Sequence, residues 1–251
     1  MTDRSVVLDQ AIRSLVIAKK DLRVYYAKGP VVMFGILMPT FLFLAFFIGR
    51  QMPVNSLIPG LLGMAVFFTA TAVSPVIAPW ETQARTLERL ASCPVAVWTI
   101  LLGDMLASVI FGIVISFVPI LVGLITGISI HHPFILAAGI VLAALCFSSM
   151  ALIFSFPATS SPAPIMMLSS LIKFPLVFVS GVFMPVGELP AWAKVIASFS
   201  PLTYFTEVTR YCMGGTSYYR LSISLLLLLM FTILFWGAAV SLHKRTLPKR
   251  L

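Results

Sequence analysis

The sequence predicts an all-α integral membrane protein that forms a single transmembrane domain over residues 1–251. Hydrophobic residues make up 60% of the 251 residues and charged residues only 10%, whereas soluble domains average about 45–50% and about 25%. The mean hydropathy is +1.06. Six apolar stretches are each long enough to cross a bilayer, because one crossing takes roughly 20 helical residues. Together these observations predict six transmembrane helices.

The N-terminal segment, residues 1–30, comes before the first apolar stretch and is predicted to form an amphipathic interfacial helix. At about 100° per residue, the apolar residues of one stripe are Val7, Ala11, Leu15, Ala18, Leu22 and Tyr25. The basic residues around the other side are Arg13, Lys19, Lys20 and Arg23. Such a helix lies on the inner leaflet with its basic side toward anionic headgroups. It acts either as a simple anchor or as a platform that also contacts a partner.

The predicted spans are, in order, residues 31–49, 57–78, 99–125, 134–156, 163–183 and 221–242. Five of them occupy the region 31–186, the sixth lies within 220–242, and residues 243–251 form a tail. The stretch between Pro157 and Pro164 is rich in Ser and Pro and cannot continue a helix. No cleavable signal peptide is expected, since the first apolar run is long and lacks a small-residue cleavage site.

The positive charges predict that both termini are cytoplasmic. Of the 17 Lys and Arg residues, ten lie before residue 30 or after residue 242. With both ends inside, the inner segments hold twelve basic residues and the outer segments four, which agrees with the positive-inside rule. The net charge of +9 therefore reflects membrane topology, and no nucleic-acid partner is expected.

The inner loop 80–98 is predicted to be helical up to Pro94. Glu81 and Arg85 stand at i,i+4, a spacing that allows an ion pair on one helical face. A short charged helix between two spans can transmit force from a soluble partner. The alternative is a solvated loop with weak surface ion pairs.

The outer segment 187–219 is too polar and too interrupted to span the membrane. It contains two helix candidates, 190–199 and 201–213, and the second has Ser200 as N-cap and Pro201 at its first position. The apolar residues on their faces are Trp192, Val195, Ile196, Phe199, Leu202, Tyr204, Phe205 and Val208. Two apolar helices at this place are predicted to be re-entrant and to cover a pathway, or else to anchor the chain in the interface.

Two ionisable residues fall inside the predicted spans. Lys173 is near the middle of the fifth span, where a charge is costly, so we expect it to line a pathway together with Phe174 and Phe178. Alternatively, it is a structural lysine that bonds carbonyl groups of a neighbouring helix. Asp104 is about one turn inside the third span, and the helix N-terminus accounts for it. A pair between Asp104 and Lys173 is a further possibility.

Several kinds of chemistry have no motif in this sequence. There is no Walker A loop to cradle nucleotide phosphates, and neither HExxH nor GxSxG occurs. The three cysteines are scattered without a CxxC pair, which argues against a disulfide framework or a zinc site. No catalytic residue, metal or cofactor is expected in this chain. A secondary transporter would require paired ionisable residues at mid-membrane or inverted repeats, and a non-transporting assembly factor is a third class.

Three stretches of the sequence resemble the permease subunits of ABC-2 type exporters. Residues 29–30 read GP before an apolar span that contains Pro39, and residues 86–95 read TLERLASCPV. The outer segment carries SGVFMP at 180–185, LPAW at 189–192 and SPLTY at 200–204, followed by Arg210. The order of these stretches agrees with that family over nearly the whole chain. One departure is Arg85, which stands where the family commonly has Gly.

The resemblance implies a permease in a prokaryotic cytoplasmic membrane, as a homodimer or a heterodimer with a related chain. Two copies of a separate ABC ATPase subunit, which bind ATP and Mg²⁺, are its implied partners besides the lipid bilayer. The residues implied for coupling to the ATPase are Glu81, Arg85, Leu87, Glu88 and Arg89. Those implied for an external gate are Pro190, Trp192, Pro201, Tyr204, Glu207 and Arg210. The expected cargo is a lipophilic or amphipathic drug or lipid, with a polysaccharide or lipid-linked saccharide as the alternative.

Overall fold

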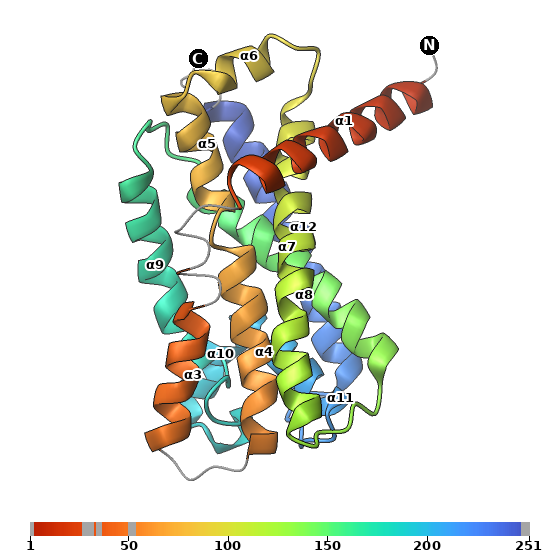
Figure 1. The fold of residues 1–251 in the computed structure, drawn as a ribbon, viewed down its shortest axis with the longest axis vertical. Helices are drawn as coiled ribbons and strands as arrows, with labels where there is room; N and C mark the ends of the chain where they lie inside the picture. The colour runs from red at the N-terminus through yellow and green to blue at the C-terminus, as the bar shows by residue number, and fades with distance from the viewer. Residues whose placement is uncertain (1–2, 27–32, 34–36, 50–53, 247–251) are drawn as a thin grey trace.

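The computed structural model describes residues 3–26, 33, 37–49 and 54–246, and the elements in these ranges are helices. The long helices run along the longest axis of the molecule, and α1 (Asp3–Val24) lies across them near one end (Figure 1). The short helix α6 (Thr86–Ala91) and the last turns of α12 (Leu221–Thr246) are at this same end. At the opposite end lie α10 (Ala191–Ser198) and α11 (Pro201–Cys212).

Within the residues that the structure describes, five helical stretches are long and apolar enough to cross a membrane, so the chain is a multi-pass membrane protein built from helices. They are Leu57–Gln83, Val97–Ile125, Pro133–Phe154, Pro162–Val179 and Leu221–Thr246. The last four of these correspond to α7, α8, α9 and α12. The first predicted span, 31–49, lies partly outside the described residues, and α3 (Met38–Gly49) occupies its second half. A sixth span therefore stays a prediction.

The second predicted span is not one continuous helix. It is divided into α4 (Val54–Ala70) and α5 (Ser74–Gln83), with a turn between them. Pro75 occupies the first turn of α5, where its fixed φ suits a helix start and its missing N–H cannot bond to the turn before it. The proline thus explains why an apolar stretch of sufficient length is interrupted in the middle.

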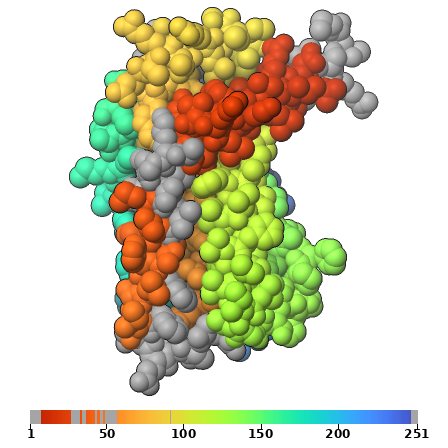
Figure 2. Space-filling view, viewed as in Figure 1, coloured from red at the N-terminus to blue at the C-terminus, as the bar shows by residue number. Residues whose placement is uncertain are grey.

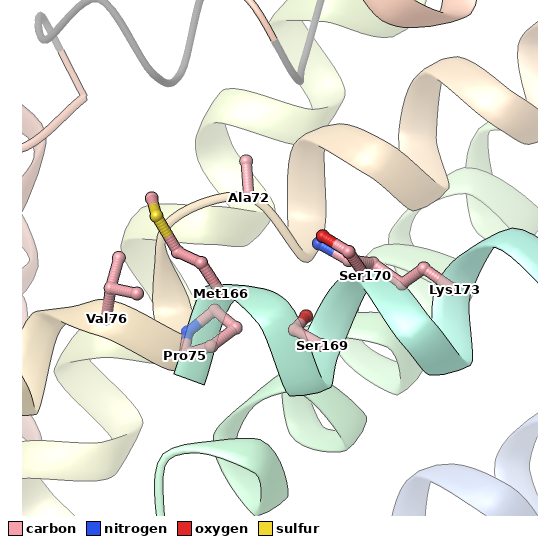
Figure 3. A pocket seen from close by; sticks show the side chains of 7 residues that line it. All are labelled: Ala72, Pro75, Val76, Met166, Ser169, Ser170 and Lys173. Carbon is pink, nitrogen blue, oxygen red and sulfur yellow. The ribbon is translucent and has the colours of Figure 1, made fainter. Parts of the chain in front are cut away.

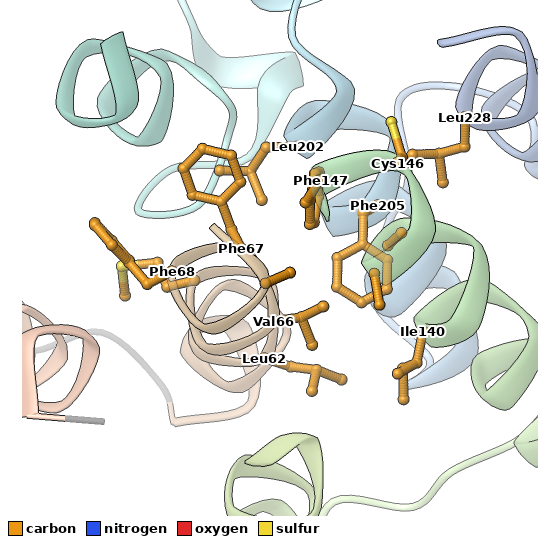
Figure 4. Close-up of a cluster of buried hydrophobic side chains, with 14 of the residues drawn as sticks. Leu62, Val66, Phe67, Phe68, Ile140, Cys146, Phe147, Leu202, Phe205 and Leu228 are labelled. Carbon is orange, nitrogen blue, oxygen red and sulfur yellow. The ribbon is translucent and has the colours of Figure 1, made fainter. Parts of the chain in front are cut away.

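The core is built where α4, α8 and α11 meet, and aromatic side chains fill it (Figure 4). The ring centroid of Phe147 is 5.0 Å from that of Phe67 and 6.0 Å from that of Phe205, both in edge-on geometry. The most apolar window of the α4–α5 stretch is 83% buried, whereas that of α12 is only 17% buried. A helix that is apolar on all sides and yet little covered by its own chain needs lipid or another protein chain around it.

Helix α1 has two faces, and the predicted single apolar stripe is wrong in part. One face packs chiefly against α7 and buries Ser14, Ile17, Ala18, Asp21 and Tyr25. The other exposes Leu8, Ile12, Leu15 and Val16. Leu15, which was assigned to the same stripe as Ala18 and Tyr25, is on the exposed face because the helix rotates its polar Ser14 and Asp21 toward the protein.

The contact between α1 and α7 is close (Figure 2). A Cβ atom on Gly103 of α7 would lie only 2.5 Å from the Ile17 Cγ2 and 3.0 Å from the Ser14 carbonyl oxygen. Glycine at this position therefore permits the two helices to touch. The helix is held to the body of the protein as well as being available to the membrane surface.

Candidate functional site

The inner loop between α5 and α7 contains the residues predicted to couple transport to ATP hydrolysis. Its short helix α6 is anchored by Leu87, which is only 2% exposed. Arg85, Glu88 and Arg89 are exposed around this anchor. The loop thus exposes two positive charges and one negative charge around a short helix that Leu87 fixes to the rest of the protein.

The predicted continuous helix from Glu81 to Pro94 is wrong. Helix α5 ends at Gln83, and Arg85 adopts a left-handed conformation with φ of 53° before α6 begins at Thr86. Arg85 is the one non-glycine residue with positive φ in the part of the chain that the structure describes. A left-handed backbone conformation favours glycine, because glycine has no Cβ. Glycine would therefore fit position 85 better than arginine does.

Glu81 is not on the outward face of the loop. Its side chain is 2% exposed and accepts a hydrogen bond from the Lys20 ammonium of α1. The Thr86 hydroxyl in turn donates to the Glu81 carbonyl oxygen at 3.3 Å. The predicted i,i+4 pair with Arg85 is therefore replaced by an ion pair to another helix, because the chain turns between the two residues.

Helix α1 also holds the other end of the loop, where it enters α7. The Gln10 side chain donates to the Pro94 carbonyl oxygen at 3.1 Å and accepts hydrogen bonds from the Ala96 N–H at 3.2 Å and the Thr99 hydroxyl at 2.7 Å. The Arg13 guanidinium donates to the same Pro94 carbonyl oxygen. Both ends of the inner loop are thus bonded to one helix.

Lys173 lies on α9 and contacts the interruption between α4 and α5. Its Nζ donates a hydrogen bond to the Thr71 carbonyl oxygen at 3.2 Å. In a continuous helix, the N–H group four residues later would donate a hydrogen bond to the Thr71 carbonyl oxygen. The residue at that position is Pro75, which has no N–H group. Lys173 therefore supplies the donor that the interrupted helix lacks, which is the contact expected of a structural lysine.

A small cavity lies beside Lys173, and the side chains that line it come from α9 and from the α4–α5 junction (Figure 3). Its lining residues are Ala72, Pro75, Val76, Met166, Ser169, Ser170 and Lys173. The cavity measures about 20 Å³, enough for roughly one water molecule and far below the 300–1,000 Å³ or so of a ligand pocket. The space beside Lys173 is therefore too small to hold a substrate molecule.

The two other residues predicted to line the pathway have different surroundings. The ring of Phe174 packs against the core, with its centroid 5.9 Å from that of Phe68. Phe178 is exposed, and its ring centroid is 5.5 Å from that of Phe183. Asp104 does not approach Lys173 but faces Asp21 of α1.

The two outer helices differ sharply in burial. On α10, Trp192 is 65% exposed and Pro190 before it is also exposed. On α11, all the residues from 201 to 210 are buried against α4, α8 and α12, including the four predicted gate residues. Those four are Pro201, Tyr204, Glu207 and Arg210. A Cβ on Gly63 of α4 would lie 2.7 Å from the Thr206 side chain, which shows how tightly α11 is seated.

The charged residues of α11 bond to backbone groups and not to each other. The Arg210 guanidinium donates to the Gly181 carbonyl oxygen at 2.6 Å. The Glu207 carboxylate accepts hydrogen bonds from the N–H groups of Tyr218 and, at 3.1 Å, Tyr219. Burial raises the pKa of Glu207, although these N–H groups and nearby Arg210 oppose the shift. Both side chains therefore fasten the segments on either side of α11 to that helix.

The comparisons with known proteins agree with this arrangement. A family model described as ABC-2 type transporter matches residues 14–214, which is most of the chain and runs from within α1 to just beyond the end of α11. The chain belongs to the ABC-2 type transporter family. A search of curated proteins gives no match. The resemblance inferred from the sequence motifs is thus confirmed, and ABC-2 permeases usually work with an ABC ATPase partner.

In this ABC-2 permease, the residues that sequence reasoning missed are the polar ones on α1. Gln10 received no role and Lys20 was assigned to the headgroup side, yet these side chains bond α1 to the inner loop and α7. Asp21 received no role either, although it is fully buried beside Lys20. A polar cavity of about 210 Å³ at the outer end, lined in part by Glu188 and Glu207, was also missed. The polar pattern of α1 was visible in the sequence, but its partners are about 60 to 90 residues away.

Proposed function

We propose that this chain is the permease subunit of an ABC exporter that moves a lipophilic or amphipathic molecule across a prokaryotic cytoplasmic membrane. In this proposal two permease chains, identical or related, work with two copies of a separate ATPase that binds ATP and Mg²⁺. Residues 31–49 form a sixth span, and both termini and α6 face the cytoplasm. The positive-inside charge distribution supports this orientation.

The observation that carries the proposal is the form of the inner loop. Arg85, Glu88 and Arg89 point outward from a helix that Leu87 anchors, which is what a docking surface for a separate subunit requires. Glu81 takes part indirectly, through its ion pair with Lys20. Movement imposed on α6 by the ATPase reaches α7 directly and reaches α1 through Glu81 at one end and Pro94 at the other.

The substrate class is inferred from the outer half of α9 and from α10. Phe178 and Trp192 are large, exposed and apolar, and they suit a lipophilic cargo that leaves along the protein–lipid boundary. We propose that α10 is the moving part of an external gate, since its apolar face is uncovered, and that α11 is its fixed base. Trp192→Ala should then change the rate of substrate release without lowering thermal stability.

Co-purification tests the ATPase partnership. Tagged full-length chain, solubilised with its native lipids, should bring down an ABC ATPase subunit, and ATP hydrolysis by the complex should rise with substrate. If no ATPase is recovered from cells that express the whole operon, the exporter proposal fails.

The docking surface has a sharper test in Glu88→Lys. Charge reversal against a complementary partner surface costs binding energy, and a loss of about 1.4 kcal/mol lowers affinity about tenfold. Asp9→Lys makes a matching charge reversal on an exposed residue of α1, outside α6, and serves as the matched control. Transport should fall in the first variant and not in the second, with membrane insertion equal in both. Equal transport in the two variants would remove Glu88 from the coupling role.

A further inference from the structure

Four ionisable side chains meet at the junction of α1, α5 and α7. Lys20 and Asp21 come from α1, Glu81 from α5 and Asp104 from α7. All three carboxyl groups are at most 2% exposed, whereas the Lys20 side chain is 37% exposed. If every group were ionised, three buried negative charges would face a single positive charge.

The hydrogen bonds at this junction leave two of the carboxyl groups incomplete. The Lys20 ammonium donates to Glu81, and its Nζ lies 2.9 Å from the Asp21 Oδ1 as an ion pair that lacks hydrogen-bond geometry. As ionised acceptors, both oxygens of Asp21 and the Oδ1 of Asp104 have no donor among the residues that the structure describes. The carboxyl groups of Asp21 and Asp104 are neighbours at the close contact of α1 with α7, where a Cβ atom on Gly103 would lie 2.5 Å from the Ile17 Cγ2.

One proton resolves this arrangement. Two adjacent carboxylates in a buried site cannot both remain ionised, since like charges at close range repel strongly in a low dielectric. A proton between them makes one carboxyl the donor to the other and removes one unit of negative charge. We propose that Asp21 and Asp104 bind a single shared proton at neutral pH, and that this proton holds α1 on α7.

The surrounding groups favour a proton over a metal ion. Among the residues that the structure describes, no group of three or more His, Cys, Asp or Glu side chains is arranged to hold a metal ion. The other titratable groups that face the pair are Lys20, Tyr25, Tyr26 and Glu81. Burial lowers the pKa of Lys20, but Asp21, Glu81 and Asp104 raise it above its ordinary value, so the lysine stays charged. Burial also raises the pKa of Asp21.

The shared proton controls a helix on which the coupling loop depends. Helix α1 carries Gln10 and Arg13, which bond to the start of α7, and Lys20, which bonds to Glu81. A carboxyl whose pKa is raised in the folded state binds more protons there than in the unfolded state, so stability falls as pH rises toward the raised pKa. Alkaline pH should therefore loosen α1, and with it the coupling loop.

Infrared spectroscopy tests the proton directly. In the full-length chain in lipid nanodiscs at neutral pH, the carbonyl stretch of a protonated carboxylic acid should be present and should disappear in Asp104→Asn. Asp21→Asn provides an independent check if Asp104→Asn fails to fold. Asp9→Asn, an exposed substitution on the same helix, should leave the band unchanged. A spectrum in which neither variant removes a carboxylic acid band overturns the proposal.

Hydrogen exchange of α1 tests the consequence. After correction for intrinsic rates, the amide exchange rate of α1 in the wild type should increase at least about tenfold from neutral to alkaline pH. Asp104→Asn should show no such increase, because the amide side chain is uncharged at both pH values. Exchange that responds to Na⁺ or K⁺ at constant pH would show a bound cation in place of the proton. Equal pH dependence in the wild type and both Asn variants would equally refute the shared proton.

Discussion

Replacing Lys173 with Met tests what this buried lysine of α9 does. The substitution keeps a long apolar stem but removes the donor to the Thr71 carbonyl oxygen, which is 3.2 Å from the lysine Nζ. Pro75 cannot supply a replacement, because it has no N–H. A buried acceptor left without a donor costs about 1–3 kcal/mol, which corresponds to a roughly 5- to 150-fold change in the unfolding equilibrium.

The measurement is unfolding of the purified permease from detergent–lipid micelles, by heat or by titration with a denaturing detergent. Lys173→Arg keeps a donor and should retain most of the stability. Ser170→Ala removes a hydroxyl that lines the same cavity and is the matched control, with little effect expected. If Lys173→Met is as stable as the wild type, the argument from the broken helix is wrong. An altered substrate affinity at unchanged stability would instead support a lysine that lines the pathway.

Three further predictions concern single positions. Arg85→Gly should raise the free energy of unfolding by about 1 kcal/mol, because glycine adopts the left-handed conformation without a steric penalty. Arg85→Ala should not raise it. Equal melting temperatures for the two variants would contradict the left-handed backbone at residue 85. Gly60→Ala should destabilise by about 1–3 kcal/mol, since its Cβ would lie 2.0 Å from the Val182 carbonyl oxygen; Gly237→Ala, which meets nothing within 4 Å, is the control in the same thermal assay. Gln10→Ala removes three hydrogen bonds to the start of α7. It should lower the amount of substrate transported per ATP hydrolysed, with a smaller effect on the rate of ATP hydrolysis. If the ratio of transport to hydrolysis is unchanged, α1 does not transmit coupling.

Much of the fold could be predicted because membrane insertion leaves a strong trace in sequence. Runs of about 20 apolar residues rarely serve any purpose other than crossing a membrane. The SGVFMP, LPAW and SPLTY stretches of the outer segment are the most specific indication of the family. The interruption at Pro75 could also have been predicted, because proline in the middle of an apolar stretch ends or bends a helix. It was overlooked because hydropathy averages across the break.

The site was predicted less completely, for a physical reason that Glu81 illustrates. Its spacing from Arg85 predicts a helical ion pair, yet the chain turns at Arg85 and Glu81 pairs with Lys20, 61 residues away in the sequence. Periodicity predicts neighbours only while the helix continues. Once it ends, partners are set by which helices pack together.

The sequence by itself determined that this chain is a multi-pass helical membrane protein, that it belongs to a family of ABC transporter subunits, and that its charged loop lies between two spans. Only the tertiary structure decided which apolar surfaces face protein and which face lipid. The α4–α5 stretch is largely buried and α12 is largely uncovered, although both are strongly apolar. Hydropathy measures the free energy of leaving water, and this quantity is nearly the same for a protein core and for a bilayer. For the same reason the partners of Lys20, Asp21 and Asp104 could be recognised only when α1 was placed against α7.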